Sequence, residues 1–274
     1  MSIPAHRSVS RTAWRNGAPS IGTRAAPEET PLALSFGGST IAVMMGTPAA
    51  LEDFAVGFCL NEGIVTNHAD ILSVTAVEAD GGIDLQIDLA DNAAEALKKR
   101  RRAMAGPVGC GLCGVESIEA ALRKPTSFAG ATLLLTPADI RDAVASLADR
   151  QPLHAMTHAV HAAGFFGPGE GVVAVREDVG RHNALDKLCG ALARSGRNGG
   201  AGAVVVTSRV SVEMVQKTAA CGSSFILAVS APTALAIRAA EEANITLVAL
   251  VRGADFDVYT HHNRIVTGAR AHVA

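Results

Sequence analysis

Residues 203–211 read Ala203-Val204-Val205-Val206-Thr207-Ser208-Arg209-Val210-Ser211, an aliphatic run that ends in hydroxyl and guanidinium side chains. Three other aliphatic runs lie in the same half of the chain, at residues 172–175, 225–229 and 245–251. Short strands without polar alternation are typical of a sheet that is buried on both faces. Because helical segments separate the runs, we expect parallel crossovers and an α/β fold, with a mixed or parallel sheet flanked by helices.

The first half of the chain indicates a smaller α+β region. Strands are expected on either side of the Gly37-Gly38 turn and again over 71–77 and 83–89. Thr47-Pro48 can open a helix that runs past Phe58, with Thr47 as its cap. The expected organisation is a flexible N-terminal tail over 1–24, a smaller α+β domain over 25–125, and an α/β cofactor-binding domain over 126–274.

Composition excludes several classes of protein. The 274 residues carry a formal net charge of −2, which argues against a nucleic-acid partner. No apolar run is long enough to span a membrane, and the N-terminus lacks the apolar core of a signal peptide, so we expect a cytoplasmic protein without a membrane partner. The five cysteines should then be reduced thiols and not a disulfide framework.

Polar loops follow three of the predicted strands, at residues 176–183, 207–211 and 230–233. The carboxyl ends of parallel strands lie at one edge of a sheet, which is where ligands of such sheets bind. Hydroxyl groups, arginines and free helix N–H groups suit phosphate or pyrophosphate. Alternatively, the serines and threonines only cap helices. Three such loops on one edge favour a phosphate or nucleotide site.

The stretch Gly109-Cys110-Gly111-Leu112-Cys113-Gly114 places two thiols three residues apart among glycines. A run this rich in glycine is costly to order, so we expect an exposed, mobile loop. Five consecutive cations, Lys98 to Arg102, precede it. Nearby cations favour the reactive thiolate. The same run is also consistent with a solvated helix end, which the helix dipole favours, or with a surface that holds an anion or an acidic partner.

A single CxxC pair supports several chemistries. Structural zinc usually needs four ligands, and the remaining cysteines stand alone in the sequence: Cys59, Cys189 and Cys221. A thioredoxin-type pair begins a helix after a strand, whereas this pair follows a predicted helix. A zinc deaminase requires a His-x-Glu motif, which the chain lacks. A cysteine that carries sulfur as a persulfide fits exchange chemistry, while a dithiol redox enzyme and a cofactor-binding chaperone remain alternatives.

A group of histidines raises metal binding as a further chemistry. Three histidines lie close together near the glycine-rich turn around Glu170: His154, His158 and His161. They lack an ordered pattern of carboxylates, and such histidines are more often polar or structural residues. No metal ligand is therefore predicted.

Five motifs resemble those of the formate dehydrogenase accessory sulfurtransferases (FdhD), and the resemblance runs from about Glu29 to Arg264. The motifs are Thr47-Pro48 with Asn61-Glu62-Gly63-Ile64, the loop of residues 109–114, the stretch 177–187, the stretch 208–217, and Ser230-Ala231-Pro232-Thr233 with Val258-Tyr259-Thr260. Two positions depart from the family pattern. Gly46 stands where a bulkier residue is expected, and Cys221-Gly222-Ser223-Ser224 replaces a Gly-hydrophobic-Pro turn.

The resemblance implies a sulfur carrier protein. A cysteine desulfurase would load sulfur onto Cys110 as a persulfide, with Cys113 as its neighbour. The sulfur would then pass to bis-molybdopterin guanine dinucleotide, the molybdenum cofactor of formate dehydrogenase, and a guanine nucleotide such as GDP would mimic part of that cofactor. A cytidine-deaminase-like fold without deaminase chemistry and a homodimer are also implied.

The predicted cofactor-binding residues form two groups. The resemblance points to one stretch: Phe256, Asp257, Val258, Tyr259, Thr260 and His261. The strand-end loops supply the second group: Arg181, His182, Asn183, Ser208, Arg209, Ser211, Ser230 and Thr233. We expect both groups to serve one cofactor.

Overall fold

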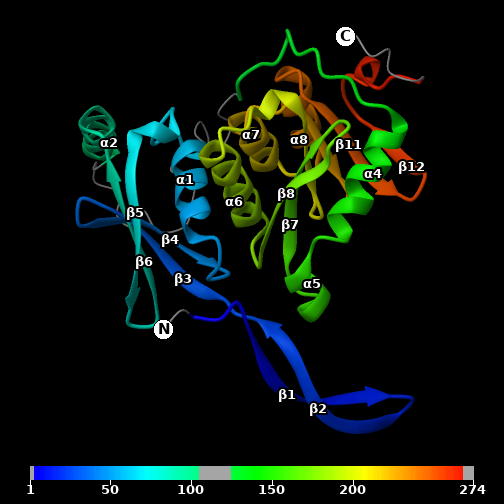
Figure 1. The fold of residues 1–274 in the computed structure, drawn as a ribbon, viewed down its shortest axis with the longest axis horizontal. Helices are drawn as coiled ribbons and strands as arrows, with labels where there is room; N and C mark the ends of the chain where they lie inside the picture. Colours follow the sequence, from blue (N-terminus) through cyan, green and yellow to red (C-terminus); the bar gives the residue numbers. More distant parts are fainter. Residues whose placement is uncertain (1–2, 105–124, 268–274) are drawn as a thin grey trace.

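The computed structural model describes residues 3–104 and 125–267. A six-stranded sheet forms a larger lobe, a four-stranded sheet forms a smaller lobe, and a two-stranded hairpin projects away from both (Figure 1). The predicted cysteine loop and the C-terminal end lie outside the described residues. Among the helices of the described ranges, none is both long and apolar enough to cross a membrane.

The larger sheet has the order β12-β11-β10-β9-β7-β8. Its strands are β7 (His161–Gly167), β8 (Gly171–Asp178), β9 (Ala203–Val206), β10 (Phe225–Ala228), β11 (Thr246–Arg252) and β12 (Asp255–Val258). The three central strands β9, β10 and β11 are parallel, while β7 and β12 are antiparallel to their neighbours. The predicted α/β sheet is therefore confirmed as a mixed sheet; its likeness to cytidine deaminase remains a prediction.

Strand β7 was not predicted, although it lies at the centre of the fold between β8 and β9. Its sequence, His-Ala-Ala-Gly-Phe-Phe-Gly, has two strand-favouring phenylalanines, but its two alanines and two glycines are depleted in strands, so no strand pattern stands out. Burial between two strands decides its conformation. Gly164 lets the covering helix approach closely, because a Cβ there would lie 2.8 Å from a methyl carbon of Leu147 and that side chain would have to shift.

Helices cover both faces of this sheet. On one face lie α6 (Arg181–Arg194), α7 (Val212–Ala220) and α8 (Ala234–Glu242), and on the other lies α4 (Pro137–Ala148). Thr136 caps α4 through a capping box with Asp139. The sheet residues alternate between the two cores, so that Val204 packs under α6 and α7 while Val205 packs under α4. Both faces are apolar, as the aliphatic runs predicted.

The smaller lobe has the strand order β4-β3-β6-β5. Its elements are β3 (Thr30–Phe36), β4 (Ser39–Gly46), α1 (Leu51–Asn61), the short 3-10 turn η1 (His68–Asp70), β5 (Ile71–Ala79), β6 (Gly82–Leu89) and α2 (Asp91–Met104). Two further 3-10 turns, η2 (Gly199–Ala201) and η3 (His262–Arg264), lie in the larger lobe. The four predicted strands are confirmed. The predicted cap is wrong: Ala50 precedes α1 in the left-handed conformation, and Thr47 makes contacts to the other lobe instead.

The two lobes meet where α1 packs against α6 at two glycines. A Cβ on Gly57 would lie 1.7 Å from the carbonyl oxygen of Asp186, and one on Gly190 would lie 1.9 Å from that of Asp53. Only residues without a side chain allow the helix backbones to approach this closely. The contact fixes the orientation of α6, whose N-terminus carries several predicted site residues.

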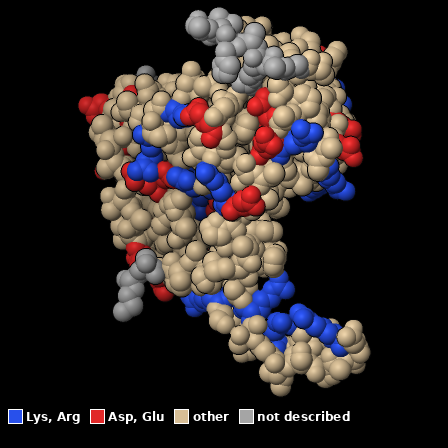
Figure 2. Space-filling view, turned by 45° about the vertical axis from the view of Figure 1, so that its right-hand side comes forward, with Lys and Arg blue, Asp and Glu red and all other residues tan. Residues whose placement is uncertain are grey.

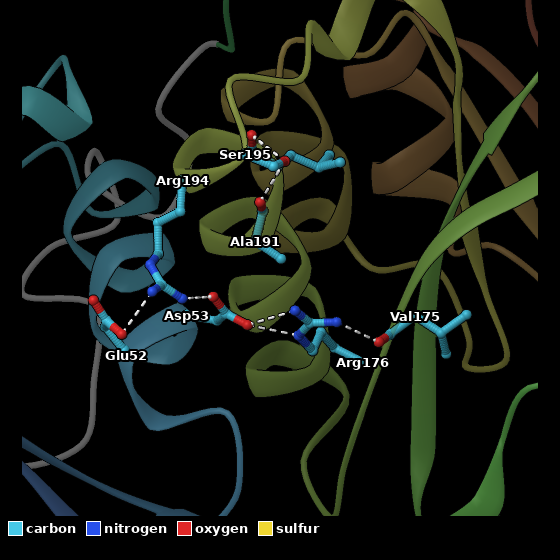
Figure 3. A network of polar contacts seen from close by, with 8 residues as sticks. Glu52, Asp53, Val175, Arg176, Ala191, Arg194 and Ser195 are labelled. Carbon is cyan, nitrogen blue, oxygen red and sulfur yellow. Dashed lines mark hydrogen bonds and ion pairs between the residues drawn. The ribbon is translucent and has the colours of Figure 1, made fainter.

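A buried carboxylate reinforces the helix contact (Figure 3). Asp53 on α1 accepts hydrogen bonds from Arg176 Nε on β8, at 2.7 Å, and from Arg194 Nη1 at the end of α6, at 2.5 Å. Arg194 also pairs with Glu52 at 2.6 Å. One carboxylate and two guanidinium groups thus connect α1 to a strand and a helix of the larger lobe.

The N-terminal residues are not the loose tail that was predicted over 1–24. Strands β1 (His6–Arg15) and β2 (Ala18–Pro27) pair over their full length. Asn16 and Gly17 both have positive φ, as a two-residue hairpin turn requires. This Asn-Gly pair was the signal in the sequence that the prediction missed.

The expectation of isolated, reduced cysteines is also wrong for one pair. Cys189 on α6 and Cys221 after α7 form a disulfide, with their Cα atoms 5.1 Å apart. They are 32 residues apart in the sequence, and they meet because α6 and α7 pack side by side on the same face of the sheet.

Candidate functional site

The three predicted strand-end loops come together at one edge of the larger sheet. The Val210 backbone N–H donates to Ala231 O at 3.2 Å, and the Thr233 N–H donates to Val210 O at 2.9 Å. These bonds join the loops after β9 and β10. The loop after β8 reaches the same edge. Asp178, the last residue of β8, pairs with His161 at the start of β7, and the next residue of β7, Ala162, donates its N–H to Thr207 Oγ1. The predicted convergence is therefore confirmed.

His182 lies between two helix N-termini at this edge. Its Nε2 is 3.9 Å from Oε2 of Glu213, which is in the first turn of α7. Burial, followed by the charges of Arg181 and Lys217, lowers the pKa of His182 from 6.5 to about 4, against the opposing effect of Glu213 and Glu62. At neutral pH the imidazole is therefore uncharged, and the positive charge of the edge comes from arginine.

Arg181 and Arg209 supply that charge. Arg181 is half-buried at the start of α6, and Arg209 is exposed after β9. The N-termini of α6 and α7 add the positive ends of two helix dipoles. Two guanidinium groups beside two helix N-termini form an arrangement that can receive a phosphate or pyrophosphate group.

Several predicted site residues support the loops and do not face solvent. Asn183 is 2% exposed, and its amide nitrogen donates to Met45 O at 2.8 Å and to Asp178 Oδ1 at 3.1 Å. Ser208 is 3% exposed and donates to Arg209 O. The amide of Asn183 and the hydroxyl of Ser208 thus hold the framework of the edge.

The alternative that hydroxyl residues cap helices holds for one position. The Thr233 side chain accepts a hydrogen bond from Ala236 N at 3.2 Å and caps α8. Ser211 occupies the N-cap position of α7 without a capping hydrogen bond from its side chain. Ser230 is half-buried after β10. Ser211 and Ser230 therefore remain candidates for contact with a ligand.

A buried ion pair holds the loop after β8, and sequence reasoning did not assign it a role. Lys187 on α6 is fully buried, and its Nζ donates to Asp178 Oδ2 at 2.6 Å and to Thr47 O at 2.8 Å. The Thr47 N–H donates to the same carboxylate at 3.0 Å. Thr47 Oγ1 accepts from Val179 N at 3.1 Å. The segment before α1 is thus bonded directly to the site loop.

Gly46, one of the two departures from the family pattern, lies at this junction. A Cβ on Gly46 would lie 2.8 Å from Leu32 Cδ1 and 3.0 Å from Asn183 Nδ2. A bulkier residue would therefore displace the amide that holds the site loop.

The second predicted group, Phe256 to His261, does not lie with the strand-end loops as one unit. Strand β12 begins beside Arg252 and ends beside Val248, so it runs back toward the opposite edge of the sheet. Thr260 is 3% exposed, and its hydroxyl is bonded to Leu247 N and Ile245 O. A small cavity of about 280 Å³ lies next to it, lined by Glu241 and residues 258–263. The two groups therefore lie at different edges of the sheet, and their service to one cofactor stays a prediction.

The remaining members of this group have local roles. Phe256 and Val258 pack partly against the core under α4, and the Tyr259 hydroxyl donates to Asp257 at 3.4 Å. His261 Nε2 lies 3.2 Å from Glu241 O and 3.8 Å from Glu241 Oε2. Four members of the stretch line the small cavity: Val258, Tyr259, Thr260 and His261.

The predicted catalytic residues, Cys110 and Cys113, lie outside the described residues, as do the side chains of the basic run from Lys98 to Arg102. The other three cysteines have fixed surroundings. Cys59 is buried, and burial, together with the charge of Asp186, raises the pKa of its thiol to about 12. Cys189 and Cys221 form the disulfide. None of these three offers a reactive thiolate.

His154, His158 and His161 do not lie with Glu170, because His161 begins β7 and Glu170 lies in the turn at its other end. Within residues 3–104 and 125–267, no three His, Cys, Asp or Glu side chains are close enough together to hold a metal ion. His154 and His158 contact each other edge to face, with ring centroids 5.4 Å apart, and His154 Nδ1 lies 3.3 Å from Val160 O.

The depressed pKa of His182 predicts how acid affects stability. Between pH 6.5 and about 4 the unfolded chain binds a proton at this position that the folded chain excludes, so folding stability should fall as the pH is lowered through this window. A His182→Gln variant should lose less stability than the parent between about pH 7 and about pH 5. Urea midpoints measure this, with the exposed His68→Gln as the matched control. Equal losses in all three proteins would contradict the assignment.

These features define a class: a two-lobed α/β protein whose candidate binding edge is built from strand-end loops and held by a buried ion pair. The chain belongs to the FdhD/NarQ family, whose family model matches residues 27–266. The resemblance seen in the motifs is confirmed.

Relatives of known name extend over nearly the whole chain. It is 57% identical over 261 residues to the "Sulfur carrier protein FdhD" of Agrobacterium fabrum, a match that covers 95% of this chain and 96% of that protein. A protein of the same name from Brucella abortus is 55% identical over 260 residues, which is 95% of this chain and 97% of the relative. A crystal structure of a formate dehydrogenase accessory protein from Desulfotalea psychrophila has a TM-score of 0.77 at 25% identity and covers 96% of this chain and 100% of that one.

Proposed function

We propose that this chain is a sulfur carrier that serves formate dehydrogenase. It takes sulfur from a cysteine desulfurase as a persulfide on Cys110 and delivers it to bis-molybdopterin guanine dinucleotide. The names of the relatives support the carrier role. The desulfurase, the persulfide and the cofactor are parts of our proposal.

One observation carries the proposal for the carrier residue. The chain has five cysteines, and the surroundings of three exclude them. Cys59 is buried with a raised pKa, and Cys189 and Cys221 are joined to each other. A carrier needs an accessible thiolate. Cys110 and Cys113 are the two cysteines that remain, and they stand together in the glycine-rich stretch that follows five cations.

The transfer balances without an external oxidant. The Cys110 thiolate attacks the outer sulfur of the desulfurase persulfide, a new S–S bond forms, and the cysteine thiolate of the desulfurase leaves. Delivery as hydrosulfide requires two electrons. Attack by the Cys113 thiolate on the inner sulfur of Cys110 supplies them, because it expels hydrosulfide and leaves a Cys110–Cys113 disulfide. Release of hydrosulfide therefore explains why a second thiol, Cys113, stands close to Cys110 in the sequence.

The strand-end edge is the proposed position for a nucleotide part of the cofactor. Arg181 and Arg209 would bind the pyrophosphate together with the N-terminus of α6, and Ser211 and Ser230 offer hydroxyl groups. The uncharged His182 can donate or accept a hydrogen bond without adding charge. The cavity beside Tyr259 and His261 is a separate candidate for another part of the same cofactor.

Sulfur loading tests the proposal directly. After incubation with a cysteine desulfurase and cysteine, intact-mass spectrometry should show this protein heavier by one sulfur atom, and a reductant should remove the increment. Peptide mapping should place it on Cys110. A Cys59→Ala variant is the matched control and should load as the parent does. A protein that never gains sulfur, yet still activates formate dehydrogenase, would favour a chaperone that only binds the cofactor.

Nucleotide affinity tests the proposed edge. Calorimetry should show binding of GDP that is weakened about tenfold or more by Arg181→Gln or Arg209→Gln, because each loses a charged hydrogen-bond donor to phosphate. Arg252→Gln, which replaces the exposed last residue of β11, serves as the control. Equal affinity for GDP and ADP would count against guanine specificity. Unchanged affinity in both edge variants would remove the nucleotide from this edge.

A further inference from the structure

Helices α6 and α7 lie side by side on one face of the larger sheet (Figure 1). They run in the same direction, because the strands before them, β8 and β9, are both antiparallel to β7. Three pairs of side chains join the two helices: His182 with Glu213, Asp186 with Lys217, and Cys189 with Cys221. Successive members are three or four residues apart in the sequence, so the pairs form one seam, which we call the α6–α7 seam. The first pair lies at the candidate binding edge, and the disulfide lies two turns, about 10 Å, further along α6.

The middle pair holds the α6–α7 seam without the disulfide. Asp186 is 1% exposed, and its Oδ1 accepts a hydrogen bond from Lys217 Nζ at 2.6 Å. Asn61 at the end of α1 donates to the same oxygen, and Lys217 Nζ also lies 3.7 Å from Glu62 Oε1. Apolar side chains of both helices share one core. A chain of this size with such contacts does not depend on one covalent bond to fold, so we expect the seam to survive when the disulfide opens.

The surroundings of the two cysteines suit both redox states. Their Cα atoms are 5.1 Å apart, which is within the range of a disulfide. As a thiol, Cys189 would stay in the apolar core at 3% exposure, and its Sγ lies 3.6 Å from Lys217 O, which can accept the S–H. Cys221 is half-buried at the C-terminal end of α7 and is the more exposed of the two. Exchange with a small molecule therefore begins at Cys221.

Two observations separate this pair from the proposed sulfur carrier. Cys221 belongs to the second departure from the family motifs, Cys221-Gly222-Ser223-Ser224, so those motifs do not account for the pair. Lys217, one turn before Cys221, already pairs with two carboxylates, so little of its charge is left to favour a thiolate. Figure 2 shows Lys and Arg interspersed with Asp and Glu over the visible face of the two lobes. The reduced pair should therefore exchange slowly, as a switch and not as a sulfur carrier.

We propose that Cys189 and Cys221 are a reversible thiol–disulfide couple that locks α7 to α6 and thereby steadies the start of α7 at the candidate binding edge. The oxidant is a low-molecular-weight disulfide. The Cys221 thiolate attacks one of its sulfurs, and one small thiolate leaves. The Cys189 thiolate then attacks the Cys221 sulfur, which forms the protein disulfide and expels the second small thiolate.

Electrons and protons balance in this exchange. The two cysteines lose two electrons, the small disulfide gains them, and the two protons pass to the released thiolates. A small thiol reverses both steps. The couple does not depend on the proposed sulfur transfer.

Redox titration of the full-length protein tests the couple. Samples equilibrated in buffers of reduced and oxidised glutathione are quenched with acid, alkylated in denaturant and mapped by mass spectrometry. Cys189 and Cys221 should pass together from alkylated to protected within the range of these buffers, and Cys59→Ala should leave the midpoint unchanged. In the Cys189→Ser variant, glutathione should accumulate on Cys221. In the Cys221→Ser variant, the buried Cys189 should take up far less.

The melting temperature reports on the lock. A bond between residues that are 32 apart in the sequence restricts the unfolded chain, so the oxidised protein should melt roughly 4–16 °C above the reduced protein. Cys189→Ser should remove this shift, and the variant should still fold because its hydroxyl can donate to Lys217 O. A chain with both Cys110→Ala and Cys113→Ala should keep the shift, which assigns it to the other pair.

Hydrogen exchange shows whether the lock reaches the edge. Met214 and Val215 donate their N–H groups to Ser211 O near the start of α7. A peptide that contains these two residues should exchange severalfold faster when the protein is reduced, while a peptide from β3 in the smaller lobe should not change.

Three results would overturn the proposal. A pair that stays oxidised in the folded protein under excess dithiol is a structural disulfide. A pair that stays reduced in the most oxidising buffer is not a couple. Equal exchange at the start of α7 in both redox states would refute the link between the disulfide and the binding edge.

Discussion

When the carrier has the substitution Cys110→Ala, the formate dehydrogenase that it serves should be at least about 100-fold less active than with the parent carrier. The substitution removes the covalent sulfur acceptor, and with it the whole transfer route, not just part of a binding site. The variant should keep the melting temperature of the parent, since a glycine-rich stretch contributes little packing. Activity of the client enzyme and thermal unfolding of the carrier are the two measurements. Full activation by a folded Cys110→Ala protein would remove the carrier role from this residue.

Cys113→Ala is the matched variant in the same stretch. If Cys113 supplies the two electrons that release hydrosulfide, this variant should still load sulfur but deliver it slowly. Added dithiol reductant should restore delivery, because it can attack the persulfide in place of Cys113. Cys110→Ala should not respond to the reductant. The pair of variants therefore separates loading from release.

Replacement of Lys187 by methionine should strongly destabilise the folded chain. It removes the cation that pairs with the fully buried Asp178 at 2.6 Å, and it also removes one of the two donors to Thr47 O, which keeps the Ala49 N–H. Removal of one partner of a buried ion pair typically costs about 3–5 kcal/mol, because the other charge stays buried. For a chain of this size that corresponds to a fall in melting temperature of roughly 6–20 °C.

A second substitution tests the cause of that loss. Adding Asp178→Asn to Lys187→Met removes the uncompensated charge and should recover part of the stability, whereas the two losses would simply add if the residues acted independently. Arg252→Met, which replaces an exposed cation, should change the melting temperature little. A Lys187→Met protein as stable as the parent would show that the pair is not needed to hold the loop after β8.

Features that depend on near neighbours in the chain were predicted from the sequence. The aliphatic runs around Val204 and Ile226 became buried central strands, and the polar residues after them reached one edge because parallel strands end on the same side. Gly37-Gly38 predicted a turn correctly, and the spacing of Cys110 and Cys113 identified the stretch on which the proposed chemistry rests. Each of these depends on local conformational preference or on a rule of strand direction.

Only the tertiary structure decided which residues became neighbours from distant parts of the chain. Thr47 became a partner of Asp178 and not a helix cap, because the smaller lobe packs on α6 through Gly57 and Gly190. Cys189 and Cys221 met because two helices share a face of the sheet, and β7 formed because burial between two strands outweighed its weak strand preference. The free energy of such contacts comes from burial and pairing across long separations, and no local pattern in the sequence records them.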